Sequence, residues 1–363
     1  MKLSTFVSTA FLASLANCLS LDVDSEDSIC AAAKLVADGE WNYYEGTRYG
    51  GTVGMFTYPY YWWHAGEAFG GLLNYYTFCD PTNSTLEKLL YNAMIHQAGS
   101  NWDYIPSNQS MTEGNDDQGV WGLTVMEAVE RNFTNDADHP WLELAQAVYN
   151  TMYNRWDVDS CGGGLRWQIF TWNSGYDYKN SISNACLFSM AARLARYTGN
   201  TTYAEVAEKV LTWMVEDAQF ITEENGEYII YDGAKIANNC SQVTKTRWSY
   251  TYGVLMSGCA YLYDFSLNGN GTASDADDWE GRIGEIWKAL GYFFVNDIMS
   301  ETSCYSSKSC NTDQVSFRSL FLRGLMATMQ LVNSTQSEIM KDIRTSAAGA
   351  AKSCSGGSDG VTC

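Results

Sequence analysis

Histidine is scarce in this 363-residue sequence, and its scarcity excludes a large class of sites. The three histidines, His64, His96 and His139, are far apart, and none has a Cys or His partner at the spacing of a zinc site. His96 and His139 are expected at the surface or at helix ends. After a strand pattern the sequence has neither the G-x-S-x-G turn of serine hydrolases nor a G-x-G-x-x-G stretch. We therefore expect no metal and no other cofactor.

Positive charge is also scarce. Lysine and arginine number 22 against 42 aspartates and glutamates, which gives a formal net charge of −20. Such a chain repels nucleic acid and anionic lipid, so neither is expected as a partner, and it suits a neutral substrate. Aromatic residues are abundant at 14%, with 13 Trp and 24 Tyr. Flat rings with a polar handle suit stacking on sugars, although they also build ordinary cores.

Long hydrophobic runs are missing after the first twenty residues. Residues 1–20 combine Lys2, the short apolar stretch FVSTAFLASLA and a small-residue site before Leu21, which together predict a secretory signal peptide. No later run reaches the roughly 18 apolar residues of a membrane-spanning helix. The tail SCSGGSDGVTC lacks the hydrophobic segment of a GPI-anchor signal. A secreted glycoprotein is expected from the signal peptide and from seven N-x-[ST] sequons, at Asn83, Asn108, Asn132, Asn200, Asn239, Asn270 and Asn333.

Eleven cysteines fit the oxidising compartment that the signal peptide implies. Removal of the signal peptide removes Cys18 and leaves ten, an even number that suits disulfides throughout. Cys304 and Cys310 bracket a short polar loop and are the expected local pair. Cys354 with Cys363 is a candidate for another pair.

Proline is the other scarce residue, with four in the chain, and no stretch rich in Ser, Gly or Pro forms a linker before about residue 345. We expect one domain over residues 21–345 and a flexible tail over 346–363. Apolar residues recur at spacings of three and four almost throughout, which indicates helices. The predicted helices cover residues 26–43, 63–78, 84–98, 117–132, 140–156, 181–198, 202–219, 249–265, 276–297, 312–332 and 336–352.

The predicted helices alternate between two kinds. One kind is amphipathic with charged faces, as in TTYAEVAEKVLTWMVED, and the other is nearly uncharged, as in WWHAGEAFGGLLNYY and SISNACLFSMAARLA. A helix that is apolar all round is buried on every side. Inner helices that alternate with outer ones, at intervals of roughly 50 to 70 residues, indicate an all-α (α/α)6 toroid. An α-solenoid, the competing fold, would show a stricter repeat.

Each uncharged helix begins in a segment that is both polar and aromatic. In a toroid the starts of the inner helices surround one end of the barrel axis. We therefore expect these segments to meet in a single cleft and to hold the chemistry. They read YPYYWWHAGE, EGNDDQG, YKNSISN, KTRWSYTYG and CNTDQVSF.

The segment EGNDDQG contains two adjacent carboxylates, Asp116 and Asp117. At a helix start such residues are ordinary caps that complement the helix dipole. Their place on an uncharged inner helix favours a second interpretation, a catalytic pair that faces the barrel axis. Retaining glycosidases need two close carboxyl groups, and repulsion between two close acids raises one pKa so that one group stays protonated.

The residues around the pair supply further candidates. Gly114 and Gly119 would let the backbone approach a ligand closely. The candidate substrate-binding residues are Trp62, Trp63, Asn115, Gln118, Arg166, Trp167, Asn180, Asn184, Tyr250 and Tyr252. Core packing is the alternative role for the tryptophans, and helix capping is the alternative for the polar side chains. Arg318 could pair with a cleft carboxylate or lie at the surface.

These segments resemble glycoside hydrolase family 76, the endo-α-1,6-mannanases. The resemblance spans roughly Cys30 to Val332, is nearest to the fungal cell-wall members, and rests on EGNDDQGVWGLTVMEAVERNF, WWHAGEAFGGLLNYY, CGGGLRWQ, YKNSISNACLFSMAARLARYTGN, WSYTYGVLMSGCAYLY and FRSLFLRGLM. It implies an (α/α)6 barrel and a retaining mechanism on α-1,6-mannose linkages. It also implies that Asp116 is the nucleophile and Asp117 the general acid/base.

The resemblance further implies a role in fungal cell-wall biogenesis, at the cell wall or the outer face of the plasma membrane. The implied substrate is α-1,6-mannan or the GPI-core glycan, and β-glucan is a candidate acceptor if the enzyme is a transglycosidase. The fungal members usually carry a GPI-anchor signal, from which this tail departs. We expect a monomer. Two alternatives stay open: a non-catalytic mannan- or GPI-glycan-binding wall protein on the same scaffold, and another (α/α)6 enzyme such as a polysaccharide lyase.

Overall fold

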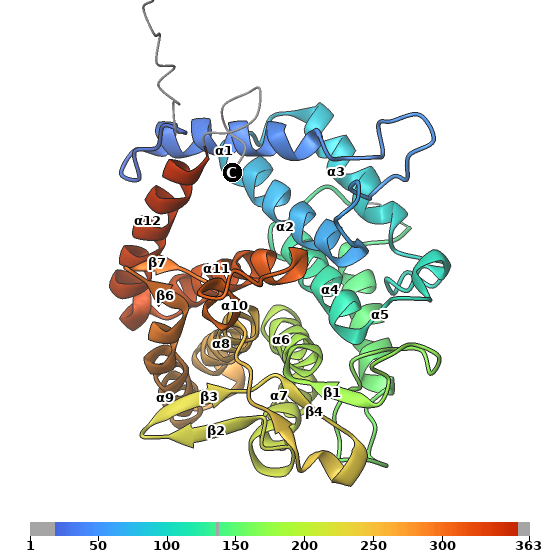
Figure 1. The fold of residues 1–363 in the computed structure, drawn as a ribbon, viewed down its shortest axis with the longest axis vertical. Helices are drawn as coiled ribbons and strands as arrows, with labels where there is room; N and C mark the ends of the chain where they lie inside the picture. Colours follow the sequence, from blue (N-terminus) through green and yellow to red (C-terminus); the bar gives the residue numbers. More distant parts are fainter. Residues whose placement is uncertain (1–18, 136–137, 355–363) are drawn as a thin grey trace, which may run out of the picture.

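Two concentric layers of helices form the protein. The computed structural model describes residues 19–135 and 138–354. All but the last two residues of the predicted signal peptide lie outside the described residues, and so does Cys363. Figure 1 shows the helices arranged around a central axis. The inner helices are α2 (Trp62–Cys79), α4 (Asn115–Glu130), α6 (Ser181–Thr198), α8 (Ser249–Phe265) and α11 (Thr312–Leu331).

The inner helices pack against one another in sequence order, and α11 also contacts α2, so the inner layer closes on itself. The outer layer holds α1 (Glu26–Trp41), α3 (Ser84–His96), α5 (Trp141–Asn154), α7 (Thr201–Thr212), α9 (Ala273–Ala289) and α12 (Gln336–Ser353). A short helix, α10 (Thr302–Tyr305), precedes α11. This alternation of inner and outer helices is that of the predicted (α/α)6 toroid, with five inner and six outer helices among the described residues.

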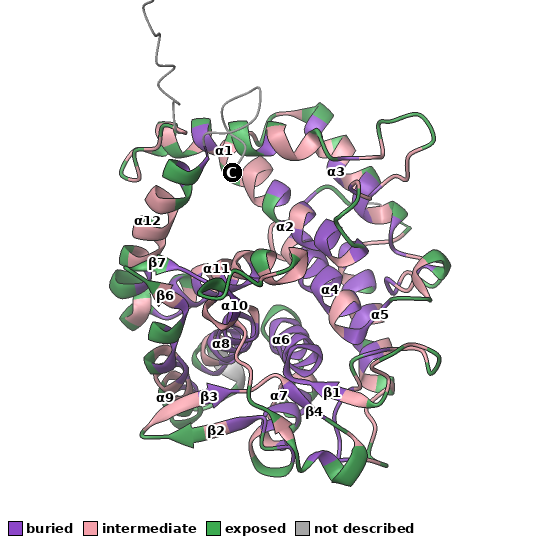
Figure 2. Cartoon of the chain, in the orientation of Figure 1, coloured by how far each residue is buried: buried purple, intermediate pink, exposed green. Residues whose placement is uncertain are grey.

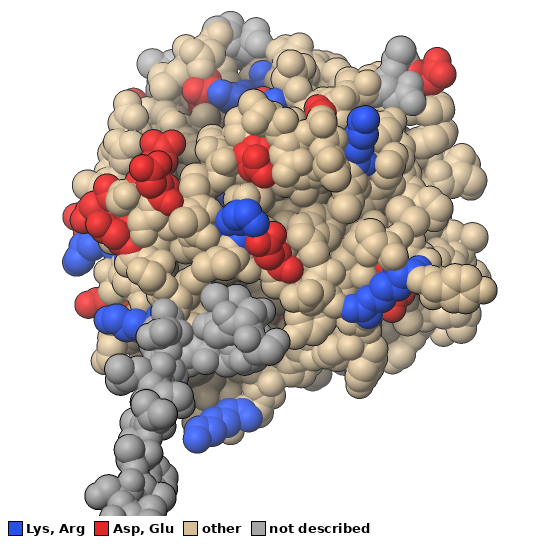
Figure 3. Space-filling view, turned by 90° about the horizontal axis from the view of Figure 1, so that it is seen from above, with Lys and Arg blue, Asp and Glu red and all other residues tan. Residues whose placement is uncertain are grey.

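Burial separates the two kinds of helix that the sequence distinguishes. Figure 2 shows α6 and α8 buried along nearly their whole length, because their small and aromatic residues contact neighbours on every side. In contrast, α1 buries only Ala32 and Ala37, and α12 buries only Ile339 and Ala351. On the face shown in Figure 3, Lys and Arg side chains stand singly among uncharged and acidic ones. None of the described helices is both long enough and apolar enough to span a membrane.

The predicted helices are confirmed, with differences at some ends. The helix predicted over 202–219 ends earlier as α7, and a single π turn over Trp213–Asp217 follows it. The helix predicted over 276–297 begins three residues earlier as α9 and ends at Ala289, where a 3-10 turn leads into a short strand. Helix α12 continues to Ser353, past the domain boundary predicted at residue 345.

The periodicity did not predict the strands. Three strands, β1 (Tyr178–Asn180), β4 (Gly233–Lys235) and β5 (Val243–Thr244), form an antiparallel sheet in the order β1-β4-β5. Two hairpins join β2 (Ile221–Glu224) to β3 (Glu227–Ile230) and β6 (Phe294–Val295) to β7 (Ile298–Met299). Asn225-Gly226 turns the first hairpin with φ of 56° and 75°, the left-handed conformation that a two-residue hairpin turn needs.

Three disulfides join described residues, one of them local and two between distant segments. The predicted Cys304–Cys310 pair is confirmed, and two further bonds are Cys30–Cys79 and Cys161–Cys240. The suggested pairing of Cys354 with Cys363 lies outside the described residues.

The expectation of disulfides throughout was wrong for Cys186 and Cys259. Both are free thiols buried on the inner helices α6 and α8. A Cβ atom placed on Gly119 of α4 would lie 2.4 Å from the Cβ of Cys186, so the two helices touch at this point. Cys186 therefore acts as a small apolar side chain, and Gly119 serves helix packing instead of contact with a ligand.

A charged network crosses the centre of the inner layer. Arg323 of α11 pairs with Glu67 of α2 at 2.6 Å and with Glu127 of α4 at 2.8 Å. Arg193 of α6 pairs with Glu130 of α4 at 2.8 Å, and Tyr261 of α8 donates its hydroxyl to Glu130 as well. Each of the five inner helices thus contributes to one network that fixes their register.

Candidate active site

A pocket of about 550 Å³ opens where the inner helices begin. This volume is in the range of small-molecule sites. All five predicted helix-start segments contribute to its lining, as the toroid requires. The lining side chains include Tyr60, Tyr61, Trp62, Trp63, Glu113, Asp116, Asp117, Trp167, Gln168, Tyr178, Asn180, Asp232, Trp248, Tyr250, Asp313, Gln314 and Phe317.

Asp116 and Asp117 lie in the first turn of α4 and line the pocket. The N–H of Gly114 donates to Oδ2 of Asp117 at 2.6 Å, and the N–H of Asp117 donates to Oδ1 of Asp116 at 3.1 Å. The two interpretations of the pair are therefore compatible, because both carboxylates accept helix-start N–H groups and still reach the pocket. A Cβ atom on Gly114 would lie 2.2 Å from Oδ1 of Asp116, so only glycine fits there.

The carboxyl groups of Asp116 and Asp117 differ in pKa. Burial raises the pKa of Asp116, and this rise is opposed by the backbone N–H groups at the helix start and by the side chains of Asn180 and Trp167. Burial also raises the pKa of Asp117, and the neighbouring charge of Asp116 raises it further. The Nδ2 atom of Asn180 lies 3.4 Å from Oδ2 of Asp116. The pair is therefore poised with Asp117 as the protonated member and Asp116 as the ionised member.

Five of the predicted substrate-binding residues line the pocket. Trp167 is 38% exposed, and the ring of Tyr250 stacks on Phe317 with centroids 3.8 Å apart. Trp63 donates its indole N–H to Oδ1 of Asp313 at 3.0 Å. The remaining two are Trp62, which is largely buried against Trp121, and Asn180.

Asn115 and Gln118 point away from the pocket, so the structure does not support their predicted contact with substrate. Both accept hydrogen bonds from the guanidinium of Arg155, which donates from Nε to Oδ1 of Asn115 at 2.8 Å and from Nη2 to Oε1 of Gln118. Asn115 also donates to the carbonyl of Arg166 at 2.9 Å. Adjacent positions on α4 project in different directions. Asn115 and Gln118 face Arg155 at the end of α5, and Asn115 also faces the backbone of Arg166.

Arg166, Asn184 and Tyr252 also lie outside the pocket lining. Arg166 pairs with Asp157 at 2.8 Å, and Asn184 binds the backbone of Leu165. The hydroxyl of Tyr252 accepts the N–H of Ile230 at 2.7 Å.

Arg318 contacts the carbonyl of Val315 and no cleft carboxylate. Arg166, Asn184 and Tyr252 support the elements around the site, whereas Arg318 hydrogen-bonds within its own helix.

The sequence reasoning missed several pocket residues. Asp232 accepts from the indole N–H of Trp248 at 3.0 Å and from the hydroxyl of Tyr178 at 2.6 Å. Asp313 lies in the first turn of α11. Trp248, Tyr178 and Asp313 belong to helix-start segments, so their position could have identified them. Asp232 follows a hairpin strand and gave no such signal.

Among the described residues, the three histidines belong to no group of His, Cys, Asp or Glu side chains that could hold a metal ion. Nδ1 of His64 accepts the N–H of Tyr61 at 3.0 Å, and burial lowers the pKa of His64. His96 is exposed at the end of α3, as predicted. His139 stacks on Trp102 with centroids 3.7 Å apart.

Glu113 is a further acid in the pocket wall. Its side chain is 1% exposed, and neither carboxyl oxygen has a hydrogen-bond partner among the described residues. Burial, and then the charge of Asp117, raise the pKa of Glu113 to about 9. The carboxyl group is therefore neutral at physiological pH.

Glu113→Gln is expected to retain activity near pH 6, because it replaces a neutral acid with a neutral amide. In the folded protein Glu113 keeps its proton up to about pH 9, whereas in the unfolded chain it loses this proton above the ordinary carboxyl pKa. The contribution of Glu113 to the free energy of unfolding therefore becomes less favourable as the pH rises toward 9. The melting temperature of the variant should exceed that of wild type by a margin that grows from pH 5 to pH 8. Glu223→Gln, at an exposed strand position, is the control and should show no such trend. A large loss of activity at pH 6 would mean that Glu113 works as a carboxylate.

Comparison with known proteins identifies the family. The model of glycosyl hydrolase family 76 matches residues 28–363. The chain belongs to glycosyl hydrolase family 76.

Curated relatives of this family 76 protein are fungal. A mannan endo-1,6-alpha-mannosidase, DFG5 of Candida albicans, is 66% identical over 348 residues, which cover 95% of this chain and 75% of the relative. DFG5 of Saccharomyces cerevisiae, with the same enzyme name, is 54% identical over 348 residues, 95% of this chain and 74% of the relative. The protein is thus a glycoside hydrolase of the fungal DFG5 and DCW1 type.

Solved structures share the fold of this family 76 enzyme. The crystal structure of Dfg5 from Chaetomium thermophilum in complex with glucosamine superposes with a TM-score of 0.86 at 33% identity, covering 94% of this chain and 83% of that one. An α-1,6-mannanase of a Salegentibacter species superposes with a TM-score of 0.68 at 16% identity, covering 92% and 90%. The second likeness establishes the fold alone.

Proposed function

We propose that this family 76 enzyme cleaves α-1,6-mannosidic bonds with retention of configuration, using Asp116 as nucleophile and Asp117 as general acid/base. The observation that carries the proposal is the pair of adjacent pocket carboxylates with unequal proton affinity. In the Salegentibacter mannanase, a variant with two adjacent aspartates replaced is inactive and binds α-1,6-mannotriose. The parallel supports the two roles.

The first step of the proposed reaction uses both carboxyl groups at once. Asp117 gives its proton to the glycosidic oxygen, and the Asp116 carboxylate attacks the anomeric carbon as the glycosidic bond breaks. The leaving sugar departs as an alcohol, and a glycosyl ester on Asp116 remains. Formation of the ester removes the negative charge beside Asp117, which lowers the pKa of Asp117 and prepares it to act as a base.

The second step releases the sugar. The Asp117 carboxylate takes a proton from water or from a sugar hydroxyl, whose oxygen attacks the anomeric carbon and regenerates the Asp116 carboxylate. Water gives hydrolysis, and a sugar hydroxyl gives transfer. Neither outcome requires a metal or an organic cofactor.

The pocket lining suits a mostly neutral glycan. Trp63, Trp167 and Tyr250 offer ring faces and edges for sugar contacts. The described lining holds Asp and Glu side chains but no Lys or Arg, and glucosamine binds the Chaetomium relative, so an amino sugar is compatible with this pocket. We propose α-1,6-mannan or a GPI-core glycan of wall mannoproteins as donor and β-glucan as acceptor.

We further propose that the protein works outside the cell, at the wall or the outer face of the plasma membrane. Among the described sequons, Asn108, Asn132, Asn200, Asn239 and Asn333 are exposed, which suits N-glycosylation. The acidic net charge suits a wall glycan better than an anionic surface.

The proposal is tested by product analysis. The purified protein is incubated with an α-1,6-mannose-containing GPI-core glycan, with and without a β-1,3-glucan oligosaccharide, and the products are identified by mass. Cleavage next to an α-1,6-linked mannose is expected in both reactions, and a donor–acceptor adduct is expected when the acceptor is present. Absence of any cleaved α-1,6 bond would refute the activity, and free glycan fragments without an adduct would assign hydrolysis alone.

A further inference from the structure

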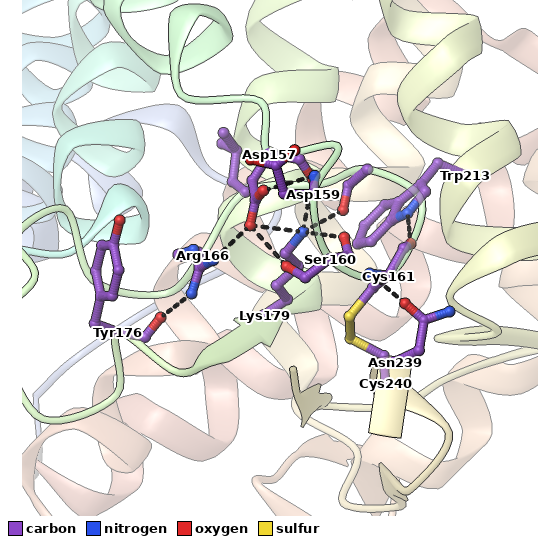
Figure 4. A network of polar contacts seen from close by, with 12 residues as sticks. Asp157, Asp159, Ser160, Cys161, Arg166, Tyr176, Lys179, Trp213, Asn239 and Cys240 are labelled. Carbon is purple, nitrogen blue, oxygen red and sulfur yellow. Dashed lines mark hydrogen bonds and ion pairs between the residues drawn. A yellow bond between two sulfur atoms is a disulfide. The ribbon is translucent and has the colours of Figure 1, made fainter. Parts of the chain in front are cut away.

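A buried ammonium group lies behind the pocket. The side chain of Lys179, in β1, is fully buried. Its Nζ donates to the carbonyls of Asp157, Ser160 and Gly163 at 2.8, 2.7 and 2.6 Å. It also lies 3.3 Å from Oδ2 of Asp157. All three N–H bonds of the ammonium are therefore used by one loop, as Figure 4 shows.

That loop, residues 157–164, is itself tightly held. The carboxylate of Asp157 accepts from the hydroxyl of Ser160 at 2.7 Å and pairs with Arg166 at 2.8 Å. The disulfide Cys161–Cys240 anchors the loop from its other side. Its carbonyls converge on Nζ in an oxygen cage, which we call the Lys179 cage and define as the carbonyls of Asp157, Ser160 and Gly163 with the Asp157 carboxylate.

Strand alternation connects the cage to the active site. Successive side chains of a strand point to opposite faces. Lys179 enters the cage, while its neighbours Tyr178 and Asn180 line the pocket. Asn180 is the residue whose amide lies 3.4 Å from the Asp116 carboxylate.

Trp167, three residues beyond the loop, connects β1 to the first turn of α4. The N–H of Trp167 donates to the carbonyl of Tyr178 at 2.7 Å, and the carbonyl of Trp167 accepts the N–H of Asn115 at 2.7 Å. The Trp167 side chain also opposes the rise in the pKa of Asp116. The loop, β1 and the first turn of α4 are therefore joined through backbone hydrogen bonds that continue from the cage.

Burial of a charged lysine carries a desolvation penalty in free energy. Burial lowers the pKa of Lys179 to about 8, although the charge of Asp157 and, more weakly, that of Asp159 oppose this shift, while Arg166 adds to it. Buried ion pairs contribute little net stability compared with well-packed apolar residues. Lys179 is next to Asn180 in β1, and β1 is hydrogen-bonded to Trp167. Because Asn180 and Trp167 both interact with Asp116, this place indicates a role in the reaction rather than in folding.

We propose that Lys179 is a positioning residue for catalysis: its ammonium locks the loop to β1 and so fixes Asn180 and Trp167 against Asp116. The kinetic test of this inference rests on the proposed function. The binding of a cation in the Lys179 cage can be tested by thermal stability, without any activity.

The kinetic test compares Lys179→Ala and Lys179→Met with Lys235→Ala. Lys235 is an exposed lysine on β4 that pairs in register with Tyr178, and it serves as the matched control. Misplacement of Asn180 is expected to lower kcat roughly tenfold to a hundredfold. Loss of the Asn180 and Trp167 donors raises the pKa of Asp116 further, so the acidic limb of the kcat/KM profile should move to higher pH in both Lys179 variants and stay unchanged in Lys235→Ala.

Chemical rescue tests the cage directly. Propylammonium equals the part of the lysine side chain that Lys179→Ala removes. It should raise the melting temperature of this variant saturably and restore kcat, whereas 1-propanol should do neither. Wild type and Lys235→Ala should not respond. Lys179→Met keeps the aliphatic length and provides the kinetic comparison if Lys179→Ala does not fold.

The outcomes separate the two proposals. A wild-type enzyme without activity on α-1,6-mannosides would remove the proposed function, while the thermal response to propylammonium would still decide whether the cage binds a cation. In an active enzyme, an unmoved acidic limb in both variants, or rescue of stability without rescue of kcat, would show that Lys179 is only structural and would overturn the inference.

Discussion

Asp116→Asn is expected to lower kcat on an α-1,6-mannoside by roughly 10⁴-fold or more, as removal of a nucleophile does in other enzymes with covalent intermediates. The amide cannot form the glycosyl ester, so no change of leaving group should restore the first step. Asp117→Asn should reduce turnover of natural substrate by a comparable factor, because the leaving sugar then departs without a proton. An aryl α-mannoside with a good leaving group needs little protonation, so Asp117→Asn should still release the aryl alcohol in a single burst.

A matched control exists for the capping role of this pair. Asp275 occupies the same third helical position at the start of α9, where its carboxylate accepts the N–H of Thr272 at 2.7 Å, and it is exposed. Asp275→Asn weakens a cap of the same kind without touching the pocket, so its activity should remain that of wild type. Because burial penalises the ionised form of Asp117, Asp117→Asn should fold with undiminished stability at neutral pH. A burst from Asp116→Asn, and none from Asp117→Asn, would reverse the assigned roles.

Arg323→Ala is expected to reduce the free energy of unfolding by about 3–5 kcal/mol, because it leaves two buried carboxylates without their cation. Arg323 is the shared partner of Glu67 and Glu127, and its side chain is 12% exposed. Burial raises the pKa of Glu67, and Arg323 is the largest opposing influence. Chemical denaturation at constant pH measures the loss, with an unchanged slope against denaturant indicating that the folded state is intact.

The control for this substitution lies on the same helix. Arg318 lies five positions before Arg323, donates to the carbonyl of Val315, and forms no ion pair in the described structure. Arg318→Ala should change stability by no more than about 0.5 kcal/mol. In the combined variant Arg323→Met, Glu67→Gln and Glu127→Gln, removal of all three charges should recover part of the stability, since no uncompensated charge remains. Equal stability of Arg323→Ala and wild type would show that water or rearrangement screens the two carboxylates.

Much of the site was predictable because the helix starts carry their own signals. Trp63, Asp116, Asp117, Asn180 and Tyr250 stand in polar segments directly before uncharged helices, and a toroid must bring such segments together. The periodicity that predicts the inner helices therefore also predicts the residues of the cleft.

The direction of individual side chains was not predictable in the same way. Asn115 and Gln118 flank the catalytic pair in the sequence, yet both turn toward Arg155. The residue at which α4 begins decides whether the side chains at positions 115 and 118 face the pocket or a neighbouring helix. The start of α4 depends on the backbone hydrogen bond that the N–H of Asn115 donates to the carbonyl of Trp167, a residue about fifty positions away.

The sequence by itself determined the helices, their inner and outer kinds, the local disulfide and the acidic pair at the start of an inner helix. These features follow from local periodicity, capping and composition, which act over a few residues. Only the tertiary structure decided that Asp232 joins the pocket, that two cysteines remain free, and that a buried lysine stands behind Asn180. Those features depend on contacts between segments far apart in the chain, and no local pattern records which distant side chains will meet.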